Sequence, residues 1–324
     1  MAIDSTTGRE ADVATFLSAY LREHGYATEE LPVEGTRRNV FAALGTPRVV
    51  LTTHMDCVPP FIAPSETNTH HLGRGSCDAK GPLAAMLAAG EALREKGVSD
   101  FGFLFVVGEE TDSSGAKDFA QKGKGRGIRY FINGEPTGNQ LMRGHKGVIA
   151  MVAERSGVAG HSAYPELFDS ALHPLLRELD TLLHTALPSD DNYGTSTVNV
   201  GRVQGGLAPN VVAEHARAEI MIRLARPLSE VKPLVLKAFS PQTRITVRSE
   251  SDPAEIFVPT GYDSDIVRFG SDVPHLRPLA VTLLVGPGSI HDAHTAGEKL
   301  AKSEQLAAVT LYQELTQRLL KEDA

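Results

Sequence analysis

Apolar runs and amphipathic stretches alternate along the first 140 residues, which predicts strands that alternate with helices. Short apolar, β-branched runs predict strands at 39–44, 48–53, 101–107 and 128–132. Helical spacing or composition predicts helices at 10–24, 83–96 and 113–122. The two runs at 39–44 and 48–53 are predicted to be neighbouring strands. Because the strand runs have no polar face, the pattern is typical of an α/β domain with a mostly parallel sheet.

The middle of the chain follows a different pattern. Its predicted strands and helices lie in the order β-α-β-β-α-β, at 148–158, 167–183, 195–203, 215–224, 229–239 and 243–249. This order is that of a ferredoxin-like α+β sandwich. From Asp263 the first pattern resumes, with a helix at 264–270, a strand at 279–285 and a helix at 303–321. The sequence therefore predicts a discontinuous first domain, residues 1–148 plus 253–324, with residues 149–252 inserted as a second domain.

Composition narrows the class of protein. The 324 residues carry a formal net charge of −8 with both signs interspersed, which argues against nucleic acid as a partner. No apolar run reaches the roughly 20 residues that span a bilayer. The two cysteines, Cys57 and Cys77, form no disulfide framework. These features predict a cytoplasmic protein with no membrane partner.

Polar, metal-ligating side chains follow three of the predicted strands. They are His54, Glu109, Glu110 and Glu135. Because ligands collect beyond the carboxyl ends of the strands in such sheets, we expect these side chains to meet at one edge.

A further carboxylate, Asp78, stands in a glycine-flanked loop within the segment 73–82, just before the predicted helix at 83–96. Two explanations are open. An Asp at this place is commonly a helix N-cap, but glycines on both sides also hold a loop in a tight conformation that suits a binding site.

Together these residues contain the parts of a two-metal hydrolytic site. Such a site needs a bridging acid, terminal ligands for each metal and a free general base. Asp78 is the candidate bridge and Glu109 the candidate base, while Asp56 fits a carboxylate that fixes the tautomer of His54. The candidate terminal ligands are His54, Glu110, Glu135 and one histidine near the C-terminus. Each motif taken singly also fits an ordinary turn or a solvated face.

The same motifs resemble a known family. The segments 54–59, 73–81, 109–110 and 134–137 are similar to those of the M20 family of co-catalytic zinc peptidases and deacylases. Within the family, the segments 135–137 and 145–147 most resemble acetylornithine deacetylases, and succinyl-diaminopimelate desuccinylases are close relatives. The resemblance implies a zinc-peptidase-like, three-layer α/β/α catalytic domain with an inserted lid or dimerisation domain.

The resemblance also implies roles for the ligands. Two zinc ions per chain, with cobalt or manganese as substitutes, would share Asp78. One ion would take His54 and Glu135, and the other would take Glu110 and a C-terminal histidine. His291 and His294 compete for the last place, and the family's spacing favours His294 because it stands four residues before Glu298. A cis peptide is expected between Asp78 and Ala79.

In the inserted domain, the resemblance implies that His161 reaches the active site of a partner subunit and helps to hold the oxyanion. Asn210 and Arg223 match substrate-contacting segments, and Arg223 suits a carboxylate. If His161 acts in this way, the protein is a homodimer.

The sequence thus leads to one main hypothesis and several rivals. The main hypothesis is hydrolysis of an N-acyl amino acid, with a bridging hydroxide as nucleophile and Glu109 as general base. Within the same fold, a di- or aminopeptidase, a carboxypeptidase or a desuccinylase is the alternative, acting on a short peptide or a succinylated amine. A non-hydrolytic binding protein is the rival from another class, although every ligand position is filled.

Overall fold

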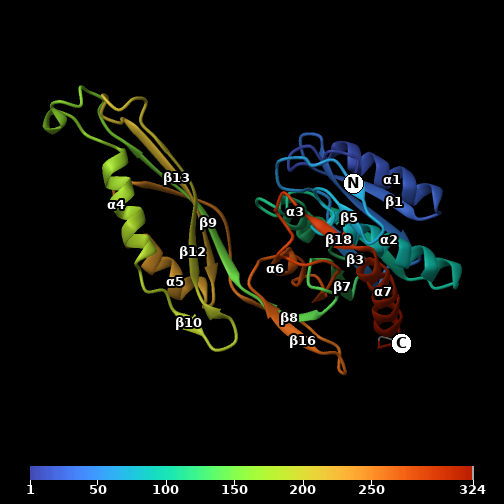
Figure 1. The fold of residues 1–324 in the computed structure, drawn as a ribbon. Helices are drawn as coiled ribbons and strands as arrows, with labels where there is room; N and C mark the ends of the chain where they lie inside the picture. Colours follow the sequence, from blue (N-terminus) through green and yellow to red (C-terminus); the bar gives the residue numbers. More distant parts are fainter. Residues whose placement is uncertain (323–324) are drawn as a thin grey trace. The chain divides into compact units, whose positions relative to one another are not determined.

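The computed structural model describes residues 1–322, which form two compact units (Figure 1). The first unit comprises Met1–Arg143, Glu255–Asp265 and the described residues from Ser271 onward. The second comprises Gly144–Ala254 and Ile266–Gly270. The chain thus leaves the first unit to build most of the second, returns at Glu255, and contributes Ile266–Gly270 to the second unit before it returns again at Ser271.

A six-stranded sheet forms the centre of the first unit, in the order β1-β2-β6-β3-β7-β17. These strands are β1 (Ala27–Glu34), β2 (Arg37–Leu44), β3 (Val49–His54), β6 (Phe101–Val106), β7 (Tyr130–Asn133) and β17 (Val281–Leu284). The last four strands of the sheet, β6, β3, β7 and β17, are parallel to one another, whereas β2 is antiparallel to β6 and β1 is antiparallel to β2. The predicted α/β class with a mostly parallel sheet is therefore confirmed.

The predicted pairing of the strands at 39–44 and 48–53 is wrong, because β6 lies between β2 and β3. Every residue of β6 is buried. Phe101, Phe103 and Phe105 pack into the core on one face of the sheet, while Leu104 and Val106 pack into the core on the other. A strand this apolar on both faces is most stable in the middle of a sheet.

Helices cover both faces of this sheet and give three layers. On one face, α1 (Ala11–Glu23), α2 (Lys80–Glu95) and α7 (Lys302–Glu322) share a core with the sheet. On the other, α3 (Ser114–Lys122) and α6 (Val273–Leu276) do the same. The helices therefore bury the sheet and leave its strand ends free to carry polar loops.

Two small three-stranded sheets are also present. One contains β4 (Ser65–Glu66), β5 (His70–Leu72) and β18 (Lys299–Ala301). The other contains β8 (Leu141–His145), β15 (Ala254–Glu255) and β16 (Ser264–Val267). The predicted helix at 264–270 is wrong, because the segment begins as strand β16, which pairs with β8. Strand pairing with a distant segment depends on tertiary contacts and cannot be predicted from the local sequence pattern.

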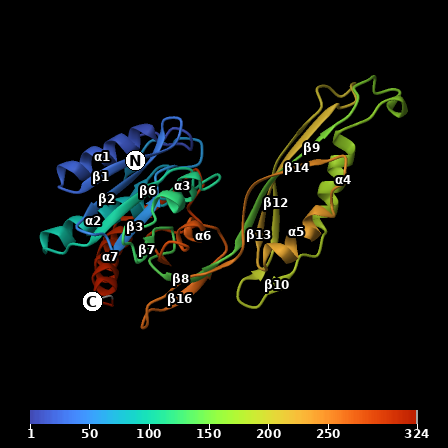
Figure 2. The same cartoon turned by 180° about the vertical axis from the view of Figure 1, so that it is seen from behind.

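The second unit has a four-stranded antiparallel sheet in the order β12-β13-β9-β14. Its strands are β9 (Gly147–Ser156), β12 (Thr197–Gly205), β13 (His215–Leu224) and β14 (Arg244–Ser251). Helices α4 (Leu172–Leu183) and α5 (Leu228–Leu236) pack on one face (Figure 2). A short turn of helix, η1 (Pro165–Leu167), precedes α4, and β10 (Ser189–Asp190) pairs with β11 (Gly194–Thr195). This is the predicted β-α-β-β-α-β order.

Across residues 1–322, no helix combines the length and the apolar character needed to cross a membrane.

The close approach of α2 to the sheet gives a testable consequence at Gly90. A methyl group there would overlap the ring of Phe103, which Tyr26, Phe101 and Phe105 hold in place. Ala is favoured over Gly in a helix by about 1 kcal/mol, but over-packing a core costs roughly 1–3 kcal/mol. We therefore expect Gly90→Ala to lower the free energy of unfolding by about 1 kcal/mol in urea titration.

Ala88→Gly, at an exposed position on the same helix, is the matched control. It should cost about 1 kcal/mol through helix propensity alone. If Gly90→Ala instead stabilises the protein by that amount, the packing argument fails.

Candidate functional site

The parallel strands of the first unit end at one edge of the sheet, and metal-ligating residues follow there. His54 is the last residue of β3, the pair Glu109 and Glu110 follows β6, and Glu135 follows β7. The loop after β17 brings His294 to the same place, where its Nε2 lies 3.0 Å from a carboxylate oxygen of Glu110. The strand order β6-β3-β7-β17 thus gathers residues that are far apart in the sequence.

His54 is fully buried and held at both ring nitrogens. Its Nδ1 lies 2.9 Å from the main-chain carbonyl of Asp56. Because a carbonyl only accepts hydrogen bonds, Nδ1 carries a proton. Nε2 points the other way, 3.1 Å from Oδ1 of Asp78 and 4.0 Å from Oε2 of Glu135. In neutral His54, Nε2 is therefore the atom that can bind a metal.

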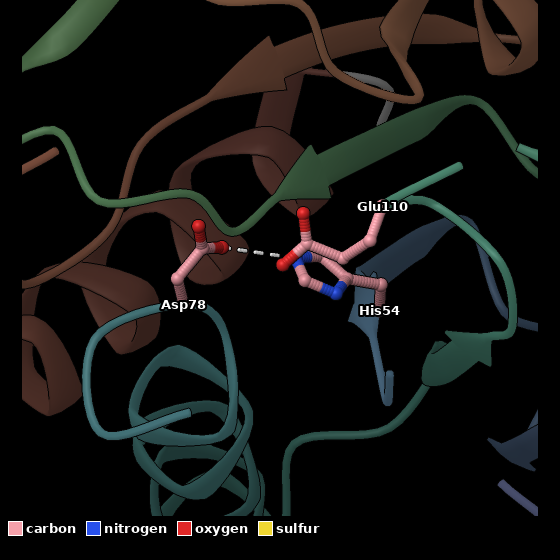
Figure 3. Close-up of side chains that lie close together, drawn as sticks. All are labelled: His54, Asp78 and Glu110. Atoms are coloured by element: carbon pink, nitrogen blue, oxygen red, sulfur yellow. Dashed lines mark hydrogen bonds and ion pairs between the residues drawn. The ribbon is translucent and has the colours of Figure 1, made fainter. Parts of the chain in front are cut away.

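Asp78 lies between two imidazoles. Its Oδ1 faces Nε2 of His54, and its Oδ2 lies 3.2 Å from Nε2 of His294. Figure 3 shows the carboxylates of Asp78 and Glu110 directed toward the His54 ring. Potential ligand atoms of these three residues all lie within 4.8 Å of one another.

The N-cap explanation of Asp78 is wrong. Helix α2 begins at Lys80, its N-cap is Ala79, and no side chain caps it. The expected cis peptide between Asp78 and Ala79 is present. The carboxylate is thus directed to the site and not to the end of the helix.

The structure distinguishes the two C-terminal histidines. His294 reaches Asp78 and Glu110 from a left-handed backbone conformation, with φ of 62°, which few residues other than glycine adopt. His291 is exposed, and its main-chain N–H donates to Oγ of Ser289. The arrangement agrees with the choice of His294 as the candidate ligand.

Asp56 differs in detail from its expected role. Its carboxylate lies 3.6 Å from Nδ1 of His54, whereas the carbonyl of the same residue is closer and orients the ring. Oδ1 instead accepts the N–H groups of Gly108 and Glu109, at 2.9 and 3.2 Å, and Oδ2 accepts that of Glu110 at 3.3 Å. The Asp56 side chain therefore anchors the loop that carries the candidate base and its neighbouring ligand, a role that no sequence motif indicated.

Carboxylate crowding shifts the pKa values in the site. Removal from water and the nearby charge of Glu135 raise the pKa of Glu109 well above its usual range. Removal from water and the charge of Asp78 likewise raise the pKa of Glu135, although His54 opposes this. For Asp78 burial alone would raise the pKa, but hydrogen bonds from His294 and His54 outweigh burial and lower it.

The pKa values of the two histidines are raised as well, which favours the charged form of each ring. Hydrogen bonds to Asp78 and Glu110 raise the pKa of His294 to about 10. The pKa of His54 is also raised, because its carboxylate partners outweigh the effect of burial.

Asp272 is a buried carboxylate that no sequence motif indicates. Burial raises its pKa to about 6, and its charge contributes to the raised pKa values of Glu109 and Glu135. Its Oδ1 has no hydrogen-bond partner in the described part of the chain. In the sequence it stands directly before Val273-Pro274 and looks like an ordinary helix cap, so nothing there singled it out.

The donor set suits divalent metal ions. Two imidazoles and the carboxylates of Asp78, Glu110 and Glu135 are the nitrogen and oxygen ligands that zinc takes in proteins, and the carboxylate of Glu109 lies close to them as a fourth. Even with both imidazoles protonated, four ionised carboxylates would leave two negative charges in excess. Divalent cations would balance this excess, and the placement of Asp78 between two histidines fits a carboxylate shared by two ions.

The remaining predicted residues lie in the second unit. Nδ1 of His161 accepts the N–H of Ala163 at 3.1 Å, which leaves the proton of a neutral ring on Nε2. Main-chain bonds join this segment to the one that carries Asn210, whose carbonyl accepts the N–H of Ser162 at 3.1 Å. Arg223 lies apart from them in sequence, on β13 opposite Thr197. His161 and Asn210 are therefore neighbours, and the roles of all three residues remain predictions.

Comparison with known proteins identifies relatives of this chain. The model of peptidase family M20/M25/M40 matches residues 50–318. A peptidase M20 domain-containing protein of Schizosaccharomyces pombe is 36% identical over 97% of this chain and 81% of its own length. A probable carboxypeptidase of Aspergillus fumigatus is 35% identical, over 100% of this chain and 86% of its own length.

Among solved structures, an M20 family metallo-carboxypeptidase from Sulfolobus solfataricus has a similar fold. The TM-score is 0.77 at 15% identity, with 97% of this chain and 95% of the other covered. At that identity the likeness concerns the fold alone. The particular resemblance to acetylornithine deacetylases finds no support in these relatives, whose names favour the peptidase alternative.

The raised pKa of His294 predicts proton release on metal binding. The stability that the protonated ring adds to metal-free protein is complete below pH 6.5 and is lost as the pH rises through about 10. At pH 8 the ring is therefore charged, yet a ligand imidazole must be neutral. We expect zinc added at pH 8 to release protons, and His294→Gln to release about one fewer per chain, in calorimetry with buffers of different ionisation enthalpy.

His291→Gln is the matched control and should release as many protons as the unaltered protein. Equal release from His294→Gln would show that this imidazole does not lose a proton to metal binding.

Proposed function

The chain belongs to peptidase family M20/M25/M40, and from this premise we propose that it is a two-metal carboxypeptidase. In this proposal it hydrolyses the amide bond that precedes a C-terminal residue with a free carboxylate. The observation that carries the metal centre is the position of Asp78, whose two oxygens face His54 and His294 separately. The names of its relatives favour peptide substrates.

In the proposed centre, His54 and Glu135 would hold one ion, Glu110 and His294 would hold the other, and Asp78 would be the carboxylate that both share. Zinc is the proposed metal, with cobalt or manganese as substitutes. When bound, two divalent ions would acidify a water molecule and polarise the scissile carbonyl. The chain's own residues provide the orientation: the Asp56 carbonyl directs the His54 ring, and the Asp56 carboxylate fixes the loop at 108–110.

Glu109 is the proposed general base. Asp56 fixes its backbone, and removal from water together with the charge of Glu135 raises the pKa of Glu109, which makes its carboxylate a stronger base. Glu109 would accept the proton of the attacking water and then pass it to the nitrogen of the leaving amino acid.

The second unit supplies the proposed contacts to the substrate. Arg223 carries a guanidinium suited to the terminal carboxylate, and Asn210 is proposed as a further contact. The Nε2 proton of His161 could be donated to an oxyanion, and we propose that it does so within a homodimer.

A deacetylase is the second candidate. An N-acetyl amino acid presents the same amide bond before a free carboxylate, so the proposed machinery would serve both reactions. The Glu135-Pro136-Thr137 segment is the observation that favours this candidate.

Four substrate types distinguish these functions on zinc- or cobalt-loaded protein. They are N-blocked dipeptides, free dipeptides, dipeptide amides, and N-acetyl or N-succinyl amino acids. We expect the largest kcat/KM for N-blocked dipeptides, because only the C-terminal carboxylate has to be free. A preference for dipeptide amides would indicate an aminopeptidase, a preference for N-acylated amino acids would indicate a deacylase, and no hydrolysis at all would favour a binding protein.

Glu109→Gln tests the base. The amide side chain keeps the size of Glu109 but cannot take a proton, so we expect kcat to fall at least roughly 10²-fold. Metal content measured by atomic absorption should stay at two ions per chain, because Glu109 is not a proposed ligand. Turnover within a few-fold of the unaltered enzyme would refute the assignment.

A further inference from the structure

Glu298 is a buried carboxylate in direct contact with the loop that carries Asp78. Its side chain is 1% exposed. Oε1 accepts two successive main-chain N–H groups, those of Cys77 and Asp78, each at 3.2 Å. Glu298 therefore fixes the backbone at the point from which the Asp78 carboxylate extends.

The other oxygen of Glu298 is paired with Arg74. Nη1 of Arg74 lies 2.7 Å from Oε2, and the guanidinium is itself buried at 4% exposure. The same Nη1 donates at 3.2 Å to the carbonyl of Thr295, the residue that follows His294. A main-chain hydrogen bond adds a further link between the same two segments: the N–H of Gly73 donates at 3.0 Å to the carbonyl of Glu298.

These bonds join two segments that are more than 200 residues apart in the sequence. One is the Asp78 loop before α2, and the other is the His294 loop before β18. Asp78 and His294 have to keep their ligand atoms in register, and each depends on a loop backbone that no strand holds at that point. A buried ion pair with several backbone bonds restrains both loops more than either loop could restrain itself.

We propose that Glu298, together with Arg74, is a positioning residue that fixes Asp78 and His294 relative to each other for metal binding. The inference rests on the proposed two-metal function and names residues that act through the ligands without touching the metal. It parallels the way in which Asp56 anchors the loop of Glu109 and Glu110.

Glu298→Gln in the full-length protein is the primary test, with Co²⁺ as the probe. The neutral amide cannot pair with the charged guanidinium, so the loops lose their common anchor. Loss of a residue that orients ligands typically weakens metal binding by roughly 10–100-fold. We expect the Kd for Co²⁺, measured by equilibrium dialysis, to rise at least tenfold, and the visible spectrum of the cobalt-saturated protein to change.

Glu178→Gln is the matched control. Glu178 also pairs with a mostly buried arginine, Arg155, at 3.3 Å, and it accepts the N–H of Ser240 at 3.1 Å, but it lies in the second unit. It should leave the Kd for Co²⁺ and the spectrum unchanged. A folded Glu298→Gln protein with a Kd and a spectrum equal to those of the unaltered protein would overturn the inference.

Two further measurements cover the case in which Glu298→Gln does not fold. The double variant R74M/E298L replaces the buried ion pair with apolar side chains of similar size, a change that folding often tolerates. It should fold and show the same weakened binding. In unaltered, metal-free protein, the amides of Cys77 and Asp78 should exchange slowly with deuterium.

The outcomes separate the two proposals. Exchange as fast as in an exposed loop would overturn the inference, whether or not any variant folds. Unaltered protein that binds no Co²⁺ would refute the proposed metal centre itself.

Discussion

Repulsion among carboxylates is the constraint on which the site depends. Four of them share a small volume with two imidazoles, and their mutual repulsion and removal from water raise the pKa of Glu109 and of Glu135. Such a cluster persists only if the rest of the fold prevents its members from moving apart. The rigid sheet provides the first restraint, because its central strands are packed on both faces.

Backbone anchoring provides the second restraint. Asp56 accepts the N–H groups of the loop after β6, and Glu298 accepts those of the loop before α2. In both cases a buried carboxylate that is not itself a proposed ligand binds the main chain, which leaves the nearby acidic side chains free to face the centre. The protein thus uses some acids to fix the position of others.

Most individual helices and strands, and the change of pattern in the middle of the chain, could be predicted because they depend on the periodicity of apolar residues. The Phe-rich run at 101–106 is a strand by any local rule, and His54, Glu110 and Glu135 follow strands that the pattern identifies. The position of β6 between β2 and β3 could not be read, since strand order depends on contacts between distant segments. For the same reason, the sequence showed only that Glu298 stands four residues after His294. Its hydrogen bonds to the N–H groups of Cys77 and Asp78 could not be predicted, because they join residues about 220 positions apart. Substrate specificity could not be predicted from the motifs either, because peptidases and deacylases of this family would use the same two-metal centre.

The discontinuous first unit has a consequence for biosynthesis. His54, Asp78, Glu110 and Glu135 all precede the second unit in the chain, whereas His294 follows it, and so does β17, the sheet strand that leads to it. A ribosome therefore completes all three proposed acidic ligands before it has made His294 and the Glu298 anchor. Until those last residues emerge, the nascent polypeptide lacks one side of its centre. The proposed centre therefore cannot assemble until the segment that follows the second unit has been made.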